Sequence, residues 1–156
     1  MLGLIPLLHF GTFQIVSLLW GSFGVNAKPI MSAPLRSTSL GEFWGKRWNF
    51  GFGQFSQELI FRPLCRPLCR PLGADAAGFL VFVASGLLHD LVISLPARGG
   101  YGLPTLYFLL QGTGMTIEHS RFGKRLGLGQ GVLGWCFMMV FLTAPVFWLY
   151  HRFTIS

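Results

Sequence analysis

Long runs of apolar residues alternate with polar or basic segments along the chain. Four of these runs are long enough to cross roughly 30 Å of hydrocarbon, because a helix rises about 1.5 Å per residue. They cover residues 2–20, 76–95, 102–118 and 131–150. An isolated span must satisfy its backbone hydrogen bonds internally, so each run is expected to be a helix. The pattern predicts an all-α, polytopic (multi-pass) integral membrane protein with about four transmembrane helices, forming a single membrane domain over residues 1–156.

The composition excludes an ordinary soluble domain. Just over half of the chain, 52%, is apolar, and 11% is charged, against about 25% in typical soluble proteins. The mean hydropathy is +0.57. A soluble domain of this size exposes too much of its surface to water to hide so much apolar area.

The basic residues lie between the apolar runs. The net charge of +7 therefore indicates residues that set the orientation of the spans in the membrane, and not a nucleic-acid-binding surface. Ten Lys and Arg residues fall in segments 21–75 and 119–130, whereas Arg98 and Arg152 fall on the opposite side. Because basic loops favour the cytoplasm, both segments are predicted to be cytoplasmic and both termini to lie outside. These cations are expected to attract anionic membrane lipids or an anionic substrate.

The first basic segment is unusually aromatic between residues 43 and 61. Ser39 is placed to cap a helix, and Glu42 follows three residues later, as in a capping box. We expect a helix lying at the membrane interface, where Trp is favoured. The residues expected on one face of this helix are Phe43, Trp44, Arg47, Trp48 and Phe55.

A four-residue repeat occupies residues 62–72, with Arg-Pro-Leu-Cys twice and then Arg-Pro-Leu. Proline at every fourth position removes helical hydrogen bonds, so this stretch is expected to be extended or turn-like. Three interpretations remain open: an anchor of spaced arginines, a phosphate-binding segment, or palmitoylation of Cys65 or Cys69. The cysteines do not supply the four ligands of a structural zinc site, so no metal is predicted.

Ionisable side chains inside apolar spans are costly and are therefore functional candidates. His89 lies about two-thirds of the way through the second span and is followed by Asp90. A neutral imidazole there can accept a proton. Asp90 is a candidate to orient it, although adjacent residues on a helix point about 100° apart. Alternatively, His89 packs between helices where Ser85 and Gly86 allow a close interface.

The third span ends in Glu118 and His119, next to the second basic segment, and these residues are expected to form an interfacial pair. The chain contains no Gly-x-Ser-x-Gly elbow, P-loop or His-Glu-x-x-His motif. A serine hydrolase, an NTPase and a zinc protease therefore have no support in the sequence.

Two motifs occur in order: Ser-Leu-Gly-Glu-Phe-Trp-Gly-Lys-Arg-Trp-Asn at 39–49 and Ser-Gly-Leu-Leu-His-Asp at 85–90, inside a span. Their pairing and setting resemble the membrane-bound O-acyltransferase superfamily, and within it the wax synthase-like branch. The resemblance covers about residues 29–156, so the chain looks like the C-terminal, active-site half of such an enzyme. Members are usually longer, which implies a missing N-terminal half or an additional membrane subunit, and a chain that is a fragment or is inactive alone.

In this superfamily the span histidine is catalytic, which maps to His89, and the Asn of the Trp-rich motif is the second active-site residue, which maps to Asn49. Wax synthase-like members often have His at the latter position, so the resemblance leaves the acceptor alcohol open. It implies transfer of an acyl group from acyl-CoA to a hydroxyl of a lipid or alcohol, with no metal or other cofactor. The residues expected to contact substrate, the cations through the CoA phosphates, are Trp48, Lys46, Arg47, Arg62 and Arg66.

A second function class remains open on the sequence alone. In this alternative the chain is a non-catalytic four-span membrane protein, either a transporter or an assembly subunit. His89 and Asp90 would then pack between helices or relay protons.

Overall fold

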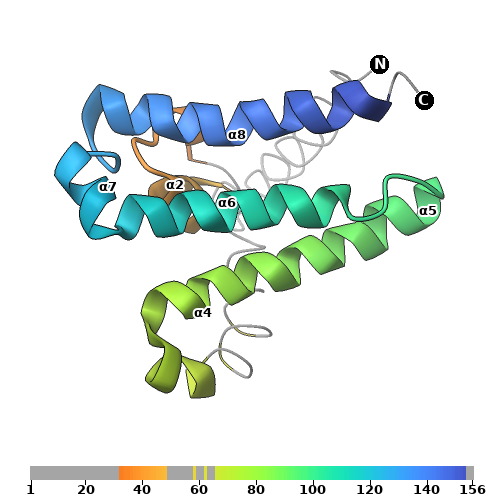
Figure 1. The fold of residues 1–156 in the computed structure, drawn as a ribbon, viewed down its shortest axis with the longest axis horizontal. Helices are drawn as coiled ribbons and strands as arrows, with labels where there is room; N and C mark the ends of the chain where they lie inside the picture. The colour runs from red at the N-terminus through yellow and green to blue at the C-terminus, as the bar shows by residue number, and fades with distance from the viewer. Residues whose placement is uncertain (1–31, 49–57, 59–61, 63–65, 154–156) are drawn as a thin grey trace, which may run out of the picture.

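The computed structural model describes residues 32–48, 58, 62 and 66–153, with the backbone alone at 66–72, 74 and 149–153. These residues form helices and turns, and no strand occurs among them. Three long helices lie side by side in one layer with α6 in the middle (Figure 1): α4 (Arg66–His89), α6 (Leu103–His119) and α8 (Gly131–Phe153). The all-α prediction is confirmed for this part of the chain, whereas the predicted span at 2–20 and Phe55 lie outside the described residues.

Short elements connect the three long helices at opposite ends of the layer (Figure 1). At one end, a π-helical turn, η4 (Asp90–Ser94), and α5 (Leu95–Ala97) continue α4 before the chain turns into α6. At the other end, α7 (Arg121–Leu126) joins α6 to α8, so part of the 119–130 segment is a short helix.

Two of the helices are long and apolar enough to cross a membrane. They are Asp75–Ala97 and Gly131–Trp148, with mean hydropathies of 1.9 and 1.8. In the most apolar stretch of each helix 22% and 11% of the residues are buried, and many of the large apolar side chains are exposed. A core helix of a soluble protein would instead turn an apolar stripe inward. The helices predicted at 76–95, 102–118 and 131–150 are all present.

The prediction of extended or turn-like chain at 62–72 is wrong for residues 66–72, where the backbone is helical. Pro67 is the second residue of α4, in the first turn, where a backbone N–H has no partner within the helix. The helical conformation breaks at Gly73, with φ 83° and ψ 167°, two residues after Pro71. This piece of helix therefore extends over about two turns and ends where Gly73 adopts a positive φ.

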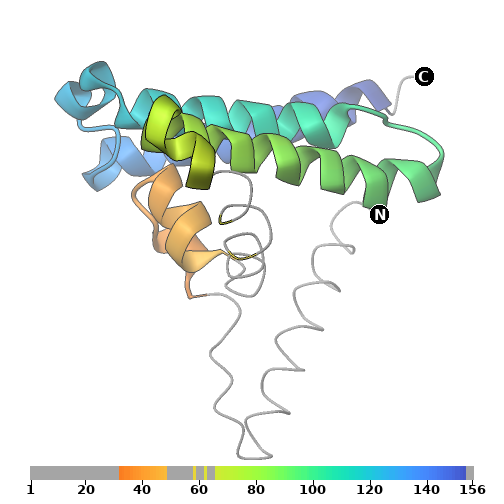
Figure 2. The same ribbon diagram turned by 90° about the horizontal axis from the view of Figure 1, so that it is seen from below.

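A second short segment, residues 32–48, packs on one face of the layer at its α7 end (Figure 2). It contains η1 (Pro34–Arg36), α2 (Leu40–Glu42) and a π-helical turn, η2 (Phe43–Arg47). The predicted cap at Ser39 is confirmed, because its Oγ accepts from Glu42 N at 2.8 Å. The Glu42 carboxylate instead accepts from Thr38 N at 3.0 Å, one residue earlier than in a capping box.

The aromatic face of this segment is turned toward the helix layer, and its position at the membrane interface stays a prediction. Leu40 and Phe43 are 0% and 4% exposed and form a core cluster with Met138 of α8. Trp44 and Trp48 pack against the same cluster. Burial of several large side chains, each worth about 1.5–3 kcal/mol, therefore fixes the segment to the bundle.

The contact between α4 and α6 depends on Gly86. A Cβ atom built on Gly86 would lie 2.9 Å from Cα of Thr105 and 3.3 Å from its carbonyl oxygen. Both of these are backbone atoms, so a side chain at position 86 would force the helices apart. The close interface expected at Ser85 and Gly86 is confirmed.

We predict that Gly86→Leu destabilises the protein by about 1–3 kcal/mol, the usual cost of overpacking. The measurement is the midpoint of thermal unfolding in detergent, followed by loss of the monodisperse peak in size-exclusion chromatography. Gly78→Ala on the same helix is the control, because its added methyl group would meet only the flexible end of Met115, at 3.3 Å. Equal midpoints for the two variants would contradict this account of the α4–α6 contact.

Candidate active site

His89 is the last residue of α4, and its hydrogen bond defines the tautomer of its ring. The Nδ1 atom lies 2.7 Å from the carbonyl oxygen of Ser85, one turn earlier. A carbonyl oxygen can only accept, so Nδ1 carries the proton. In the neutral imidazole the lone pair then resides on Nε2, the nitrogen that can act as a base.

The two sequence motifs meet through Phe108 of α6. The His89 ring lies 4.4 Å from the Phe108 ring, centroid to centroid, and Trp44 lies 5.7 Å from Phe108. Trp48 contacts Trp44 at 6.0 Å. The Trp-rich segment and the span histidine are thus connected by a row of ring contacts. Asn49, the residue after Trp48, lies outside the described residues.

An apolar cleft of about 190 Å³, lined in part by Trp44 and Trp48, lies between the 32–48 segment, α6 and α8. The two hydroxyl groups of its lining are already used in hydrogen bonds to the backbone of α8: Tyr107 donates to Leu142 O and Thr143 to Met139 O. The cleft therefore presents mainly carbon atoms. Its lining residues are Leu35, Phe43, Trp44, Trp48, Tyr107, Met139, Leu142 and Thr143.

Asp90 does not orient His89, which corrects that hypothesis. Its carboxylate accepts from Ser94 Oγ at 2.8 Å, from Gly102 N at 2.9 Å and from Thr105 N at 3.2 Å, and also from the Thr105 hydroxyl. Gly102 and Thr105 belong to the start of α6, where backbone N–H groups lack partners within the helix. Asp90 thus caps α6 from a neighbouring helix, and a negative charge there also suits the helix dipole.

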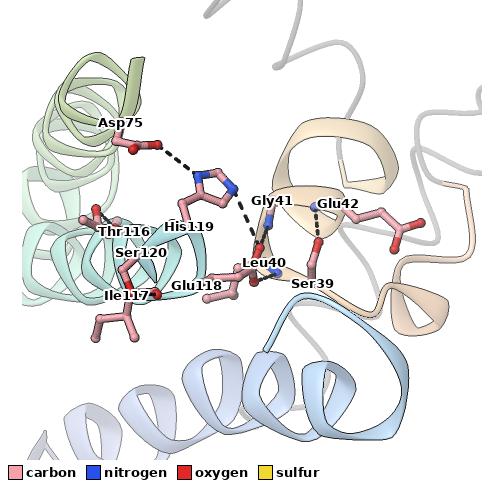
Figure 3. A network of polar contacts seen from close by, with 11 residues as sticks. Ser39, Leu40, Gly41, Glu42, Asp75, Thr116, Ile117, Glu118, His119 and Ser120 are labelled. Atoms are coloured by element: carbon pink, nitrogen blue, oxygen red, sulfur yellow. Dashed lines mark hydrogen bonds and ion pairs between the residues drawn. The ribbon is translucent and has the colours of Figure 1, made fainter. Parts of the chain in front are cut away.

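Glu118 has an analogous role at the other end of α6 (Figure 3). It is 5% exposed, and its Oε2 accepts from Leu40 N at 2.7 Å, while Oε1 lies 3.4 Å from Gly41 N. Glu118 Oε1 also lies 3.9 Å from His119 Nε2, so the expected pair of Glu118 and His119 is present, although Glu118 is buried and also binds the α2 backbone. The side chain of His119 is 41% exposed and contacts Asp75 at 3.1 Å.

The predicted substrate-binding cations differ in their surroundings. Arg47 is bonded to the Glu42 carboxylate at 2.8 Å and to the carbonyl oxygen of Ser32 at 3.3 Å. The Thr38 N–H and then the Arg47 guanidinium hold the pKa of Glu42 below its usual range. This ion pair therefore persists at neutral pH and is lost only as the pH falls through that lowered pKa. Lys46 and Arg62 are exposed, and at Arg66 the structure describes the backbone alone.

A comparison with known protein families matches the part of the chain that holds these motifs. A family model described as the membrane bound O-acyl transferase family matches residues 27–110, more than half of the chain and a range that holds both motifs. The chain belongs to this family. The match includes His89, Phe108 and the whole Trp-rich segment, whereas the α8 residues of the cleft lie beyond it.

The curated relatives from Arabidopsis thaliana include several that are named as long-chain-alcohol O-fatty-acyltransferases. Probable long-chain-alcohol O-fatty-acyltransferase 7 is 30% identical over 81% of this chain and 40% of its own length. The probable enzyme numbered 9 is 32% identical over 67% of this chain and 33% of its own length. Acyl-CoA--sterol O-acyltransferase 1 from the same plant is 30% identical over 58% of the chain and 28% of its own length.

The chain thus spans about two fifths, or less, of the length of the relatives that it matches. No solved structure matches it significantly.

Sequence reasoning missed two residues near the site. Phe108 is hidden in the sequence because aromatic residues are common in every apolar run. Gln111 gave a signal, since it is an amide inside an apolar span, and such a group needs a partner. It is 0% exposed, and its Oε1 accepts from Trp44 Nε1 at 3.3 Å.

For Glu118 we predict that replacement by Ala lowers stability by about 1–3 kcal/mol, because the buried Leu40 N–H loses its acceptor. Glu118→Gln should cost less, since the amide oxygen still accepts from Leu40 N. His119→Ala serves as the control at an exposed position. The thermal midpoint of each purified variant tests the order. A Gln variant as damaged as the Ala variant would show that the charge, and not the acceptor, matters.

Proposed function

We propose that this chain carries the active site of a wax synthase-like O-acyltransferase, which moves an acyl group from acyl-CoA to the hydroxyl of an alcohol or lipid. The observation that carries the proposal is the pairing of His89, with its lone pair on Nε2, and the aromatic Trp-rich segment across Phe108. Family membership and the names of the curated relatives support the same chemistry.

His89 is the general base in this proposal. Nε2 takes the proton of the acceptor hydroxyl while that oxygen attacks the thioester carbonyl carbon, forming the new C–O bond. The tetrahedral intermediate then breaks its C–S bond and expels the CoA thiolate, which takes the proton from His89 Nε2, so that the ester forms and the base is regenerated. The bond from Nδ1 to Ser85 O fixes the ring in the tautomer that this step requires. Asn49 donates a hydrogen bond to the developing oxyanion, as the family resemblance implies.

The apolar cleft receives an alkyl chain of a substrate. Its rings and aliphatic side chains match a hydrocarbon tail, which gains roughly 0.8 kcal/mol for each methylene removed from water. The exposed cations Lys46 and Arg62 contribute charge for the phosphates of CoA, which is a co-substrate and not a resident cofactor. Arg47 contributes less directly, because Glu42 already pairs with it.

The finer topology also belongs to this proposal: about four spans, with the 32–48 segment and α7 on the cytoplasmic side. Both lie at the same end of the layer, opposite to α5 (Figures 1 and 2), and Arg98 directly follows α5. This agrees with the excess of basic residues in segments 21–75 and 119–130. A cytoplasmic Trp-rich segment would face the acyl-CoA of the cytoplasm.

Replacement of His89 by Ala tests the function. General-base catalysis is typically worth 10²–10⁴-fold, so we expect acyl transfer to fall by at least about a hundredfold, while binding of acyl-CoA changes little. The assay measures transfer of a radiolabelled acyl group from CoA to a panel of long-chain alcohols and sterols, in membranes with matched amounts of protein. His119→Ala is the matched control, since its ring lies at the other end of α6.

An active preparation that keeps its rate after His89→Ala would exclude His89 as the base. A fall of equal size in His119→Ala would point to general damage to the fold. The midpoints of thermal unfolding of both variants, measured alongside, separate loss of chemistry from loss of structure.

The topology is tested by cysteine accessibility at two exposed positions at opposite ends of the layer. Leu126→Cys near α7 and Tyr101→Cys before α6 are made in a background that lacks Cys65, Cys69 and Cys136. In cells permeabilised only at the plasma membrane, an impermeant maleimide should label the first variant and spare the second. The reverse pattern would overturn the assigned orientation.

A further inference from the structure

Pro145 removes one hydrogen bond from the middle of α8. In a regular helix the carbonyl oxygen of Phe141 accepts from the N–H of residue 145, and proline has none. A side chain of α6 takes the vacant place: Gln111 Nε2 donates to Phe141 O at 2.5 Å. One residue further along α8, Tyr107 donates its hydroxyl to Leu142 O at 3.4 Å.

The orientation of the Gln111 amide is set by its two partners. Trp44 Nε1 can only donate, and Phe141 O can only accept, so Oε1 faces Trp44 and Nε2 faces α8. Gln111 is 0% exposed, so loss of either partner would leave a buried polar atom unsatisfied. The proline-released carbonyl therefore fixes Gln111, and Gln111 in turn holds the Trp44 ring.

The part of the cleft formed by Trp44 and Tyr107, called its inner end below, is in contact with Phe108. Both line the cleft, and both of their rings contact Phe108, at 5.7 Å in each case. Phe108 is the ring against which His89 packs. An alkyl chain that has its reacting end at His89 passes this inner end before it enters the cleft.

We propose that Gln111 is a specificity-determining residue, which sets the shape of alkyl chain that passes the inner end of the cleft by holding Trp44 in place. The inference rests on the proposed function for the role of the cleft. It assigns to Gln111 no part in the chemical step. Release of Trp44 should widen the inner end, so that chains with branches near the carbonyl are accepted more readily.

The first test compares acyl transfer from palmitoyl-CoA with transfer from a methyl-branched acyl-CoA of the same length. Gln111→Leu removes both hydrogen bonds at similar volume, and we expect the kcat/KM preference for the straight chain to fall by about threefold or more, the scale of one lost hydrogen bond. Trp44→Phe removes the Nε1 donor but keeps a ring, and should have the same effect. Thr113→Ala, at an exposed position on α6, should leave the preference unchanged.

A double-mutant cycle separates this role from a merely structural one. If Gln111 acts through Trp44, Gln111→Leu changes the chain preference in the wild-type background and has little further effect in the Trp44→Phe background. A purely structural role predicts lower rates for both substrates, an unchanged preference, and independent effects of the two substitutions. That outcome would overturn the proposal.

A binding measurement keeps the inference distinguishable from the proposed function. Straight and methyl-branched acyl-CoA probes that carry a terminal diazirine are photolysed in membranes, and the labelled residues are mapped by mass spectrometry. Labelling should fall on the α8 side of the cleft at Met139 or Leu142, persist in His89→Ala, and shift toward the branched probe in Gln111→Leu. Absence of cleft labelling in the wild-type chain would refute the role of Gln111 even if transfer is observed. The same would follow if the ratio of branched to straight labelling were equal in the wild type and in Gln111→Leu.

Discussion

The hydrogen bond from Leu40 N to the buried Glu118 carboxylate joins the Trp-rich segment to the helix layer, and the candidate site depends on it. Without an acceptor, the first N–H groups of α2 would be buried unsatisfied at the cost of one or more kcal/mol. Asp90 likewise accepts from an unpaired N–H group at the start of α6, and Gln111 donates to the carbonyl oxygen that Pro145 leaves unpaired in α8. In an apolar protein each such backbone group needs a specific partner, so a few polar side chains determine how the helices fit together.

The long helices could be predicted because length and hydropathy report directly on them. The Ser39 cap was also readable, since capping is a local interaction between residues three apart. The helical state of residues 66–72 does not follow from the spacing of the prolines, because a proline in the first turn of a helix, such as Pro67, does not interrupt it. The inward turn of the aromatic face was missed for another reason. Hydrophobicity alone does not distinguish a helix facing lipid from one facing a neighbouring helix.

The candidate site shows the same division between local and tertiary information. His89 stood out because an imidazole inside an apolar span is rare and costly. Its tautomer, however, follows from Ser85 O, and its contact with the Trp-rich segment follows from Phe108, and both required the structure. Asp90 was assigned to the wrong partner because it is adjacent to His89 in sequence. The N–H groups that it satisfies lie twelve and fifteen residues away.

The inward direction of the carboxylates has a consequence for the electric field around the molecule. The carboxylates of Asp90 and Glu118 accept hydrogen bonds from backbone N–H groups. The Glu42 carboxylate accepts from Thr38 N and pairs with Arg47. The cations of α7, Arg121, Lys124 and Arg125, are exposed and have no acidic partner among the residues that the structure describes. The counter-charge at this end must therefore come from its surroundings. In a bilayer, anionic headgroups supply it at about 1 kcal/mol per cation, so the local lipid composition becomes part of the electrostatic environment that surrounds this end of the layer.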